Sequence, residues 1–245
     1  MANFVIRSIP NTLTCCNLIS GCIATICALG GYAEEALIWI IIGAAFDFFD
    51  GMSARLLHVS SPIGKELDSL ADNITFGFAP SAIVFAELSV MDYPAAIEFL
   101  RPYLPYFAFV IAAFSALRLA KFNLDDRQTT SFIGLPTPAN ALFWGSLLIS
   151  QATAFEHSSY MVIVLLLLIC LSSWLLVSEI PIFALKFKHW GWGGNEIKYS
   201  FIVTSVVILY LCGLFKGFWI VIALYFATAC IVAFRNRNLK ENTHN

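Results

Sequence analysis

The sequence predicts an all-α integral membrane protein with about eight transmembrane helices. Of its 245 residues, 59% are hydrophobic and only 12% are charged, which is too apolar for an ordinary soluble domain. The apolar residues form runs close to the roughly 20 residues that a helix needs to cross a membrane. No internal repeat or soluble domain is evident. We therefore expect one transmembrane domain over residues 1–235, followed by a polar cytoplasmic tail over residues 236–245.

The N-terminal part of the chain predicts a surface helix followed by three spans. Residues 3–9 favour a short amphipathic helix lying at the membrane surface, and the PNTLT sequence that follows is expected to break it. The first three spans are then predicted at residues 14–32, 36–57 and 68–88. Within the third span, Gly77 and Pro80 indicate a close helix crossing or a kink.

Five further apolar runs complete the predicted set of spans. They cover residues 104–120, 139–155, 160–177, 199–213 and 216–234. With the N-terminus inside, these spans place twelve of the 14 lysines and arginines on one side and leave only Arg101 and Lys216 on the other. This asymmetry predicts a cytoplasmic position for that side. The net charge of -2 gives no reason to expect nucleic-acid binding.

One stretch, residues 47–72, carries acidic side chains within otherwise membrane-like sequence. Its four aspartates are Asp47, Asp50, Asp68 and Asp72. Helix positions three and four apart share a face, so two facing helices would hold all four carboxylates in one pocket. The only basic residues in the stretch, Arg55 and Lys65, cannot neutralise four acids at membrane depth. A divalent cation is therefore expected, and all-oxygen ligation favours magnesium, manganese or calcium over zinc.

The spacing of these residues resembles a family signature. The pattern D-x2-D-G-x2-A-R-x8-G-x3-D-x3-D is formed by Asp47, Asp50, Gly51, Ala54, Arg55, Gly64, Asp68 and Asp72, and it resembles that of the CDP-alcohol phosphotransferase family. The resemblance implies a six-helix core to which the last two spans are added, a homodimer, CDP-diacylglycerol as donor and CMP as leaving group. It also implies one or two Mg2+ or Mn2+ ions, with Ca2+ able to occupy the site without supporting turnover.

The chemistry of alcohol transfer suggests a role for each acid. Asp47, Asp50 and Asp68 are expected to hold the metal, and Asp72 to share in metal binding and act as the catalytic base. By resemblance, the residues offered to CDP-diacylglycerol are Asn11, Thr14, Gly51, Ala54, Arg55, Ser61 and Gly64. For Arg55 an interfacial anchor is the alternative role, and for Asn11 and Thr14 it is helix capping.

A second group of residues bears on the alcohol acceptor. Residues 115–123, 132–140 and 178–188 resemble the corresponding runs of bacterial and archaeal phosphatidylserine synthases of this family. This resemblance implies L-serine as acceptor and a bacterial or archaeal inner membrane. The charge asymmetry described above predicts that the active site faces the cytoplasm. Either Arg118 or Lys121 could hold the carboxylate of serine. Glycerol 3-phosphate or inositol phosphate would also attract these cations, and lipid headgroups would do so at the end of a span.

A protein of another class remains an alternative at this point. Intramembrane acids also serve as cation relays in transporters, so a cation-coupled transporter is the second hypothesis. The four aspartates are confined to one end of two adjacent predicted helices rather than distributed across the bilayer, which favours the enzyme.

Overall fold

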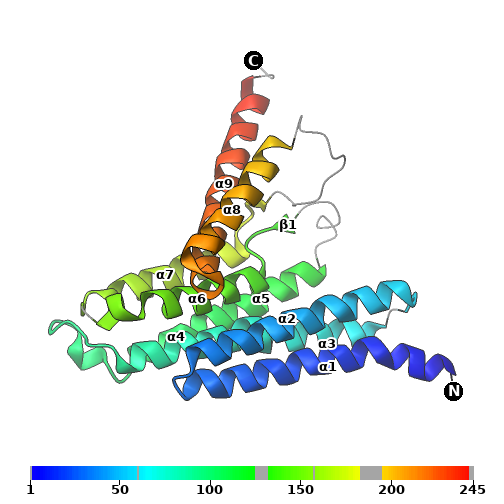
Figure 1. Ribbon diagram of the computed structural model, residues 1–245, viewed down its shortest axis with the longest axis horizontal. Helices are drawn as coiled ribbons and strands as arrows, with labels where there is room; N and C mark the ends of the chain where they lie inside the picture. Colours follow the sequence, from blue (N-terminus) through cyan, green and yellow to red (C-terminus); the bar gives the residue numbers. More distant parts are fainter. Residues whose placement is uncertain (1, 60, 125–131, 157, 183–194, 243–245) are drawn as a thin grey trace.

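The computed structural model describes residues 2–59, 61–124, 132–156, 158–182 and 195–242, and it is almost entirely helical (Figure 1). The helices in chain order are α1 (Ala2–Leu29), α2 (Ala33–Leu56), α3 (Pro62–Asp72), η1 (Asn73–Phe78), α4 (Ala79–Val90), η2 (Glu98–Leu100), η3 (Leu104–Phe109), α5 (Val110–Leu124), α6 (Thr137–Glu156), α7 (Met161–Val177), α8 (Glu196–Cys212) and α9 (Leu214–Asn242). Two short strands, β1 (Phe132–Ile133) and β2 (Pro181–Ile182), pair antiparallel. The all-α prediction is confirmed.

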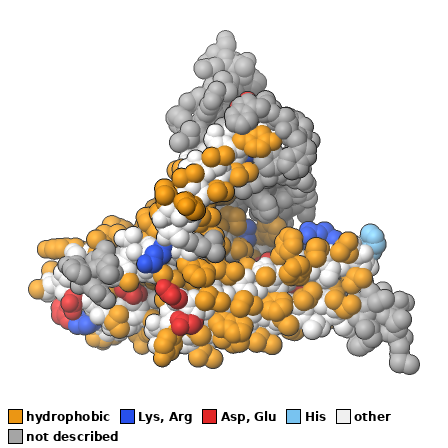
Figure 2. Space-filling view, viewed as in Figure 1, with side chains coloured by type: hydrophobic (Ala, Val, Ile, Leu, Met, Phe, Trp, Pro, Cys, Tyr) orange, Lys and Arg blue, Asp and Glu red, His pale blue; other side chains and the backbone are white. Residues whose placement is uncertain are grey.

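Four helical segments are long and apolar enough to cross a membrane. They are Ser8–Leu29, Ala33–Leu56, Pro62–Val90 and Leu104–Leu124, and the shorter apolar helices are Met161–Val177, Lys198–Cys212 and Phe215–Cys230. Apolar side chains cover much of the face shown in Figure 2. The protein is therefore an integral membrane protein, but the prediction of eight spans is not confirmed.

The first helix differs from the sequence prediction. α1 is one helix of 28 residues that includes Pro10, so the predicted break at PNTLT is wrong and residues 3–9 do not form a separate helix. A proline inside a helix removes one backbone hydrogen bond and crowds the preceding turn. In this helix the hydroxyl of Thr12 donates to the carbonyl oxygen of Ser8 at 2.9 Å, and the helix continues through the proline.

The third predicted span is a continuous helical run with a wider turn in its middle. Ser61 caps the start of α3 by accepting a hydrogen bond from the backbone N–H of Gly64 at 2.9 Å, and Pro62 occupies the first turn. The π-helical segment η1 then separates α3 from α4. In η1 the N–H of Ala79 bonds back to the carbonyl of Ile74. This wider turn accommodates Pro80, whose ring would clash with the helix in α-helical geometry.

Small residues allow α1, α2 and η1 to approach one another closely. A Cβ added at Gly21 of α1 would lie 2.8 Å from the Cα of Thr75, and one at Gly43 of α2 would lie 2.5 Å from the Cγ2 of Thr75. The hydroxyl of Thr75 donates to the backbone carbonyl of Asn17 at 3.0 Å. The three segments are therefore held in fixed register where the aspartates lie.

The remaining helices cover the bundle and enclose its apolar core. Ile40, Phe76, Leu88, Ile111 and Trp144 are among the buried side chains of this core, and the indole N–H of Trp144 donates to the hydroxyl of Ser172 at 3.2 Å. α8 and α9, by contrast, run across the direction of the other helices (Figure 1). α9 includes residues 236–242 of the predicted tail.

Candidate active site

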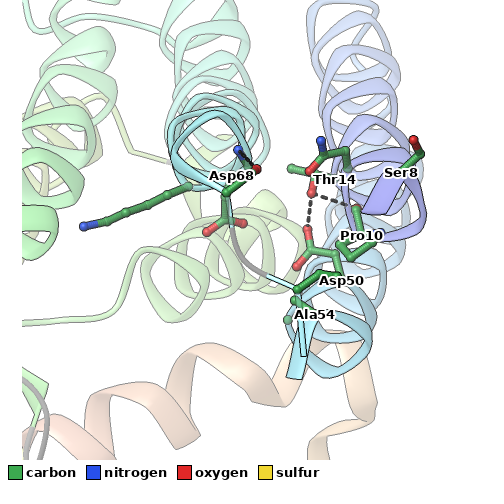
Figure 3. A pocket seen from close by; sticks show the side chains of 12 residues that line it. Ser8, Pro10, Thr14, Asp50, Ala54 and Asp68 are labelled. Carbon is green, nitrogen blue, oxygen red and sulfur yellow. Dashed lines mark hydrogen bonds between the residues drawn. The ribbon is translucent and has the colours of Figure 1, made fainter. Parts of the chain in front are cut away.

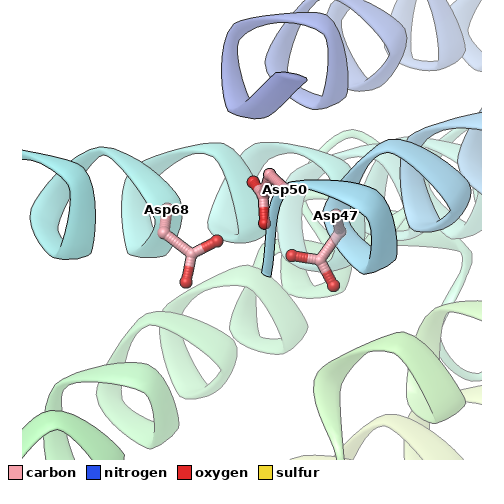
Figure 4. Close-up of side chains that lie close together, drawn as sticks. All are labelled: Asp47, Asp50 and Asp68. Atoms are coloured by element: carbon pink, nitrogen blue, oxygen red, sulfur yellow. The ribbon is translucent and has the colours of Figure 1, made fainter. Parts of the chain in front are cut away.

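Four aspartates on two helices form the centre of the candidate site. α2 supplies Asp47 and Asp50, and α3 supplies Asp68 and Asp72. Carboxylate oxygens of Asp47, Asp50 and Asp68 all lie within 4.8 Å of one another, and Figure 4 shows these side chains converging from the two helices. Asp72 lies next to Asp47, within hydrogen-bonding distance of its carboxyl group. The structure thus brings together the four acids that were predicted to share one pocket.

The acid cluster has the chemistry of a divalent-cation site. No lysine or arginine among the described residues forms an ion pair with any of the four aspartates. Asp68 has a buried carboxylate oxygen, Oδ1, for which the described residues provide no hydrogen-bond donor. A divalent cation would supply the missing positive charge, and a set of carboxylate oxygens suits Mg2+, Mn2+ or Ca2+. The residues present therefore fit the predicted metal.

Two polar side chains of α1 hold the aspartates in place. Thr14 donates from its hydroxyl to Oδ2 of Asp50 at 2.6 Å, so this side chain fixes the position of one acid of the cluster. Asn17 donates from Nδ2 to Oδ1 of Asp72 at 3.1 Å. Asn17 was not among the predicted site residues, although its position three residues after Thr14 places both on one helix face.

A cavity of about 490 Å³ adjoins the acid cluster. It is lined by Ser8, Pro10, Asn11, Thr14, Asp50, Gly51, Ala54, Val59, Ser61, Gly64, Lys65 and Asp68, and Figure 3 shows Thr14 and Asp50 joined by their hydrogen bond beside it. Six of the seven residues predicted to contact CDP-diacylglycerol lie in this lining. The seventh, Arg55, is exposed near the end of α2 and is not part of it. Lys65 lines the cavity but was not predicted to bind the donor.

The small residues of the signature keep this cavity open. A Cβ added at Gly51 would meet no described atom within 4 Å, so the backbone of α2 borders open space next to Asp50. A Cβ at Gly64 would lie 3.0 Å from both the Asn11 amide oxygen and the Ser61 hydroxyl. The hydroxyl of Ser61 already caps α3, which gives this residue a structural role as well as a place in the cavity wall.

The two cations predicted to bind the acceptor differ in their surroundings. Arg118 is only 9% exposed, donates to the hydroxyl of Thr137 at 3.5 Å and lies 5.4 Å from the centre of the Phe122 ring. It is also close enough to Asp72 for their charges to interact. Lys121 is exposed. The structure therefore places Arg118, but not Lys121, in a buried position next to the candidate base.

A helical membrane bundle with a cluster of acids beside an open cavity fits a membrane enzyme that uses a divalent cation. The model of the CDP-alcohol phosphatidyltransferase family matches residues 7–185. The chain belongs to this family, and it is an enzyme. Members of the family generally depend on a divalent metal, and the acid cluster agrees with this requirement.

Several relatives of the chain share one name. It is 36% identical to a "CDP-diacylglycerol--serine O-phosphatidyltransferase" of Bacillus subtilis over 185 residues, which covers 74% of this chain and 90% of that protein. Proteins of the same name from Helicobacter pylori and Saccharomyces cerevisiae are 34% and 39% identical over 136 and 116 residues. These matches cover 54% and 44% of this chain, and 54% and 38% of the two relatives.

Proposed function

We propose that the protein transfers the phosphatidyl group of CDP-diacylglycerol to the hydroxyl of L-serine, giving phosphatidylserine and CMP. The observation that carries this proposal is the convergence of three carboxylates beside a cavity, with Asp72 next to one of them. The name shared by the relatives supports serine as acceptor. The last part of the serine-type resemblance, residues 183–188, lies outside the described residues.

The donor would lie with its cytidine diphosphate in the cavity between α1, α2 and α3. Asn11, Thr14, Gly51, Ala54, Ser61 and Gly64 line this cavity, and Lys65 adds a positive charge to its wall. Arg55 could approach the donor only from the exposed end of α2. Asp47, Asp50, Asp68 and Asp72 would hold Mg2+ or Mn2+, which supplies charge neutralisation and polarisation of the diphosphate when bound.

The chain's own residues account for the proton transfer. The hydroxyl oxygen of serine attacks the phosphorus that carries the diacylglycerol, and the bond from this phosphorus to the CMP oxygen breaks. CMP leaves with the electron pair, while Asp72 accepts the hydroxyl proton. A carboxylate is too weak a base to form a free alkoxide, so the proton moves as the new bond forms. Asn17 holds Oδ1 of Asp72, which leaves Oδ2 to take the proton.

The acceptor would be held by its carboxylate. Arg118 is a permanent cation with forked donors, and its proximity to Asp72 places it beside the proposed base. Lys121 is exposed and would assist the binding of the serine carboxylate from the entrance to the site.

The position of the site suggests its orientation in the membrane. The ammonium group of Lys65 donates to the backbone carbonyl of Asn123 at 2.9 Å, so the start of α3 and the end of α5 meet near the acid cluster. By the positive-inside rule, this end would face the cytoplasm of a bacterial or archaeal cell.

We also expect the protein to form a homodimer. Each subunit would consist of a single transmembrane domain over residues 1–235.

An acceptor assay tests the proposal. The purified protein is incubated with CDP-diacylglycerol, Mg2+ or Mn2+, and one of L-serine, glycerol 3-phosphate or inositol phosphate, while CMP release is followed. We expect release with serine and formation of phosphatidylserine. Release only with another alcohol would overturn the choice of acceptor, and no release with any alcohol, together with metal-dependent cation flux in vesicles, would favour a transporter.

A further inference from the structure

A second cavity, of about 330 Å³, lies between α6, α7 and α9. Its lining shares no residue with that of the cavity beside the acids and is mainly aliphatic and aromatic, including Phe143, Leu171, Ile222 and Phe226. α9 is fixed to α6 by a hydrogen bond of 2.9 Å from the backbone N–H of Trp219 to the hydroxyl of Ser146. The cavity is therefore an apolar crevice, and α9, which forms one of its walls, is held in place by a hydrogen bond.

The crevice contains polar groups without partners. Asn140 is fully buried in the lining, and neither atom of its amide group has a hydrogen-bond partner among the described residues. The indole N–H of Trp219, also in the lining, is buried and lacks a described partner. A buried polar group without a hydrogen-bond partner is destabilising. Two such residues in one crevice indicate a ligand that accepts hydrogen bonds.

The chemistry of the lining defines the ligand class. No charged side chain among the described residues lines the crevice, so a charged head group would find no counter-ion in that lining. The apolar walls suit a hydrocarbon chain, and the N–H groups of Asn140 and Trp219 suit a carbonyl oxygen. An ester-linked acyl chain combines both features.

The polar part of the crevice lies close to the proposed acceptor site. Asn140 is one helical turn from Thr137, whose hydroxyl accepts from Arg118 at 3.5 Å. Arg118 in turn lies near Asp72. An acyl ester at Asn140 would thus belong to a lipid whose phosphate lies at the reacting centre.

We propose that the crevice binds one acyl chain of the phosphatidyl donor, with Asn140 donating to its ester carbonyl and α9 closing the outer side. The inference rests on the proposed function for the identity of the donor. It gives a role to α9, which lies beyond the residues matched by the family model.

Photolabelling of the unmodified protein tests this proposal directly. CDP-diacylglycerol with a diazirine in one acyl chain is irradiated on the protein, and the labelled peptides are identified by mass spectrometry. We expect labels on the α6, α7 and α9 residues of the crevice, reduced by excess unlabelled CDP-diacylglycerol. Labels confined to other helices would overturn the proposal, as would equal labelling by a diazirine phosphatidylcholine that CDP-diacylglycerol does not displace. Labelling does not require serine transfer, so its outcome is separate from that of the acceptor assay.

Kinetics of two variants provide a second test. Asn140→Leu removes the donor to the ester, and Ala223→Phe fills the crevice from α9. For a donor with long acyl chains we expect KM to rise about tenfold in each variant. For a water-soluble donor in which two acetyl groups replace the acyl chains, Ala223→Phe should leave KM unchanged. The matched control is Ala113→Phe, at an exposed position of α5. An unchanged KM for the long-chain donor in both variants would contradict the proposal.

Discussion

At the scale of single residues, the site depends on hydrogen bonds that orient its carboxylates. The spacing of the aspartates could be recognised in the sequence because residues three or four apart always share a helix face. The bonds from Thr14 to Asp50 and from Asn17 to Asp72 could not, since they join residues 36 and 55 positions apart. Their existence depends on how α1 packs against α2 and α3.

The base assignment predicts the behaviour of Asp72→Asn. This variant keeps the size of the side chain but cannot accept the proton, so we expect turnover to fall at least about a hundredfold, with CDP binding largely retained. CMP release and calorimetric binding of CDP measure the two effects. The control is Asp92→Asn, an exposed acid in the segment after α4. An equally large loss of CDP binding would count against Asp72 as the base.

The Thr14 hydroxyl predicts a difference between two substitutions. Thr14→Val keeps the shape of the side chain but removes the donor to Asp50, and we expect it to weaken Mn2+ binding about 10- to 100-fold, as loss of a ligand-orienting group does. Thr14→Ser retains a hydroxyl and should bind Mn2+ nearly as the wild type. Equal affinities for the two variants would show that this bond does not orient the metal ligand.

Arg118 and Lys121 can be compared directly. Arg118→Gln removes a buried cation near Asp72, and we expect KM for serine to rise about 10- to 100-fold, as for loss of a charged hydrogen bond. Lys121→Gln changes an exposed residue and should raise it much less. The measurement is the serine dependence of CMP release at saturating donor. A larger rise of KM in Lys121→Gln than in Arg118→Gln would assign the binding of the serine carboxylate to Lys121.

At the scale of the elements, the close approach of α1 to η1 sets the geometry of the acids. The sequence indicated a kink or close crossing near Gly77 and Pro80, and the structure has a π-helical turn there. Its form could not be predicted, because a π-turn depends on local crowding rather than on periodicity. The prediction of a break at Pro10 was wrong because the loss of one backbone hydrogen bond does not end a helix of this length.

This packing predicts that Gly21→Ala is destabilising. The added methyl group would overlap the backbone of Thr75, and overpacking of this kind costs about 1–3 kcal/mol. Thermal unfolding in detergent, followed by circular dichroism, should show a lower Tm than for the wild type. Cys22→Ala, at an exposed position of the same helix, is the control. An unchanged Tm for Gly21→Ala would mean that α1 and η1 are not in close contact.

At the scale of the whole molecule, composition and charge were sufficient to predict a helical membrane protein. The direction of α8 and α9 could not be predicted, because the hydrophobicity of a segment indicates that it is buried but does not identify the helices against which it packs. The same limit applies to the crevice, because the consecutive helices α6 and α7 form it together with α9, which comes later in the chain. The acid cluster, by contrast, comes from two consecutive helices and so was largely readable from the sequence.

The most direct measurement of the central claim is Mn2+ binding to the purified protein, followed by electron paramagnetic resonance. The four aspartates are predicted to bind Mn2+ in competition with Mg2+. The double variant Asp47→Asn/Asp68→Asn should lose Mn2+ binding while the protein stays folded. CDP-diacylglycerol should alter the Mn2+ spectrum of the wild type, because its diphosphate would bind to the ion. Unchanged Mn2+ binding in the double variant would contradict a metal site formed by these carboxylates.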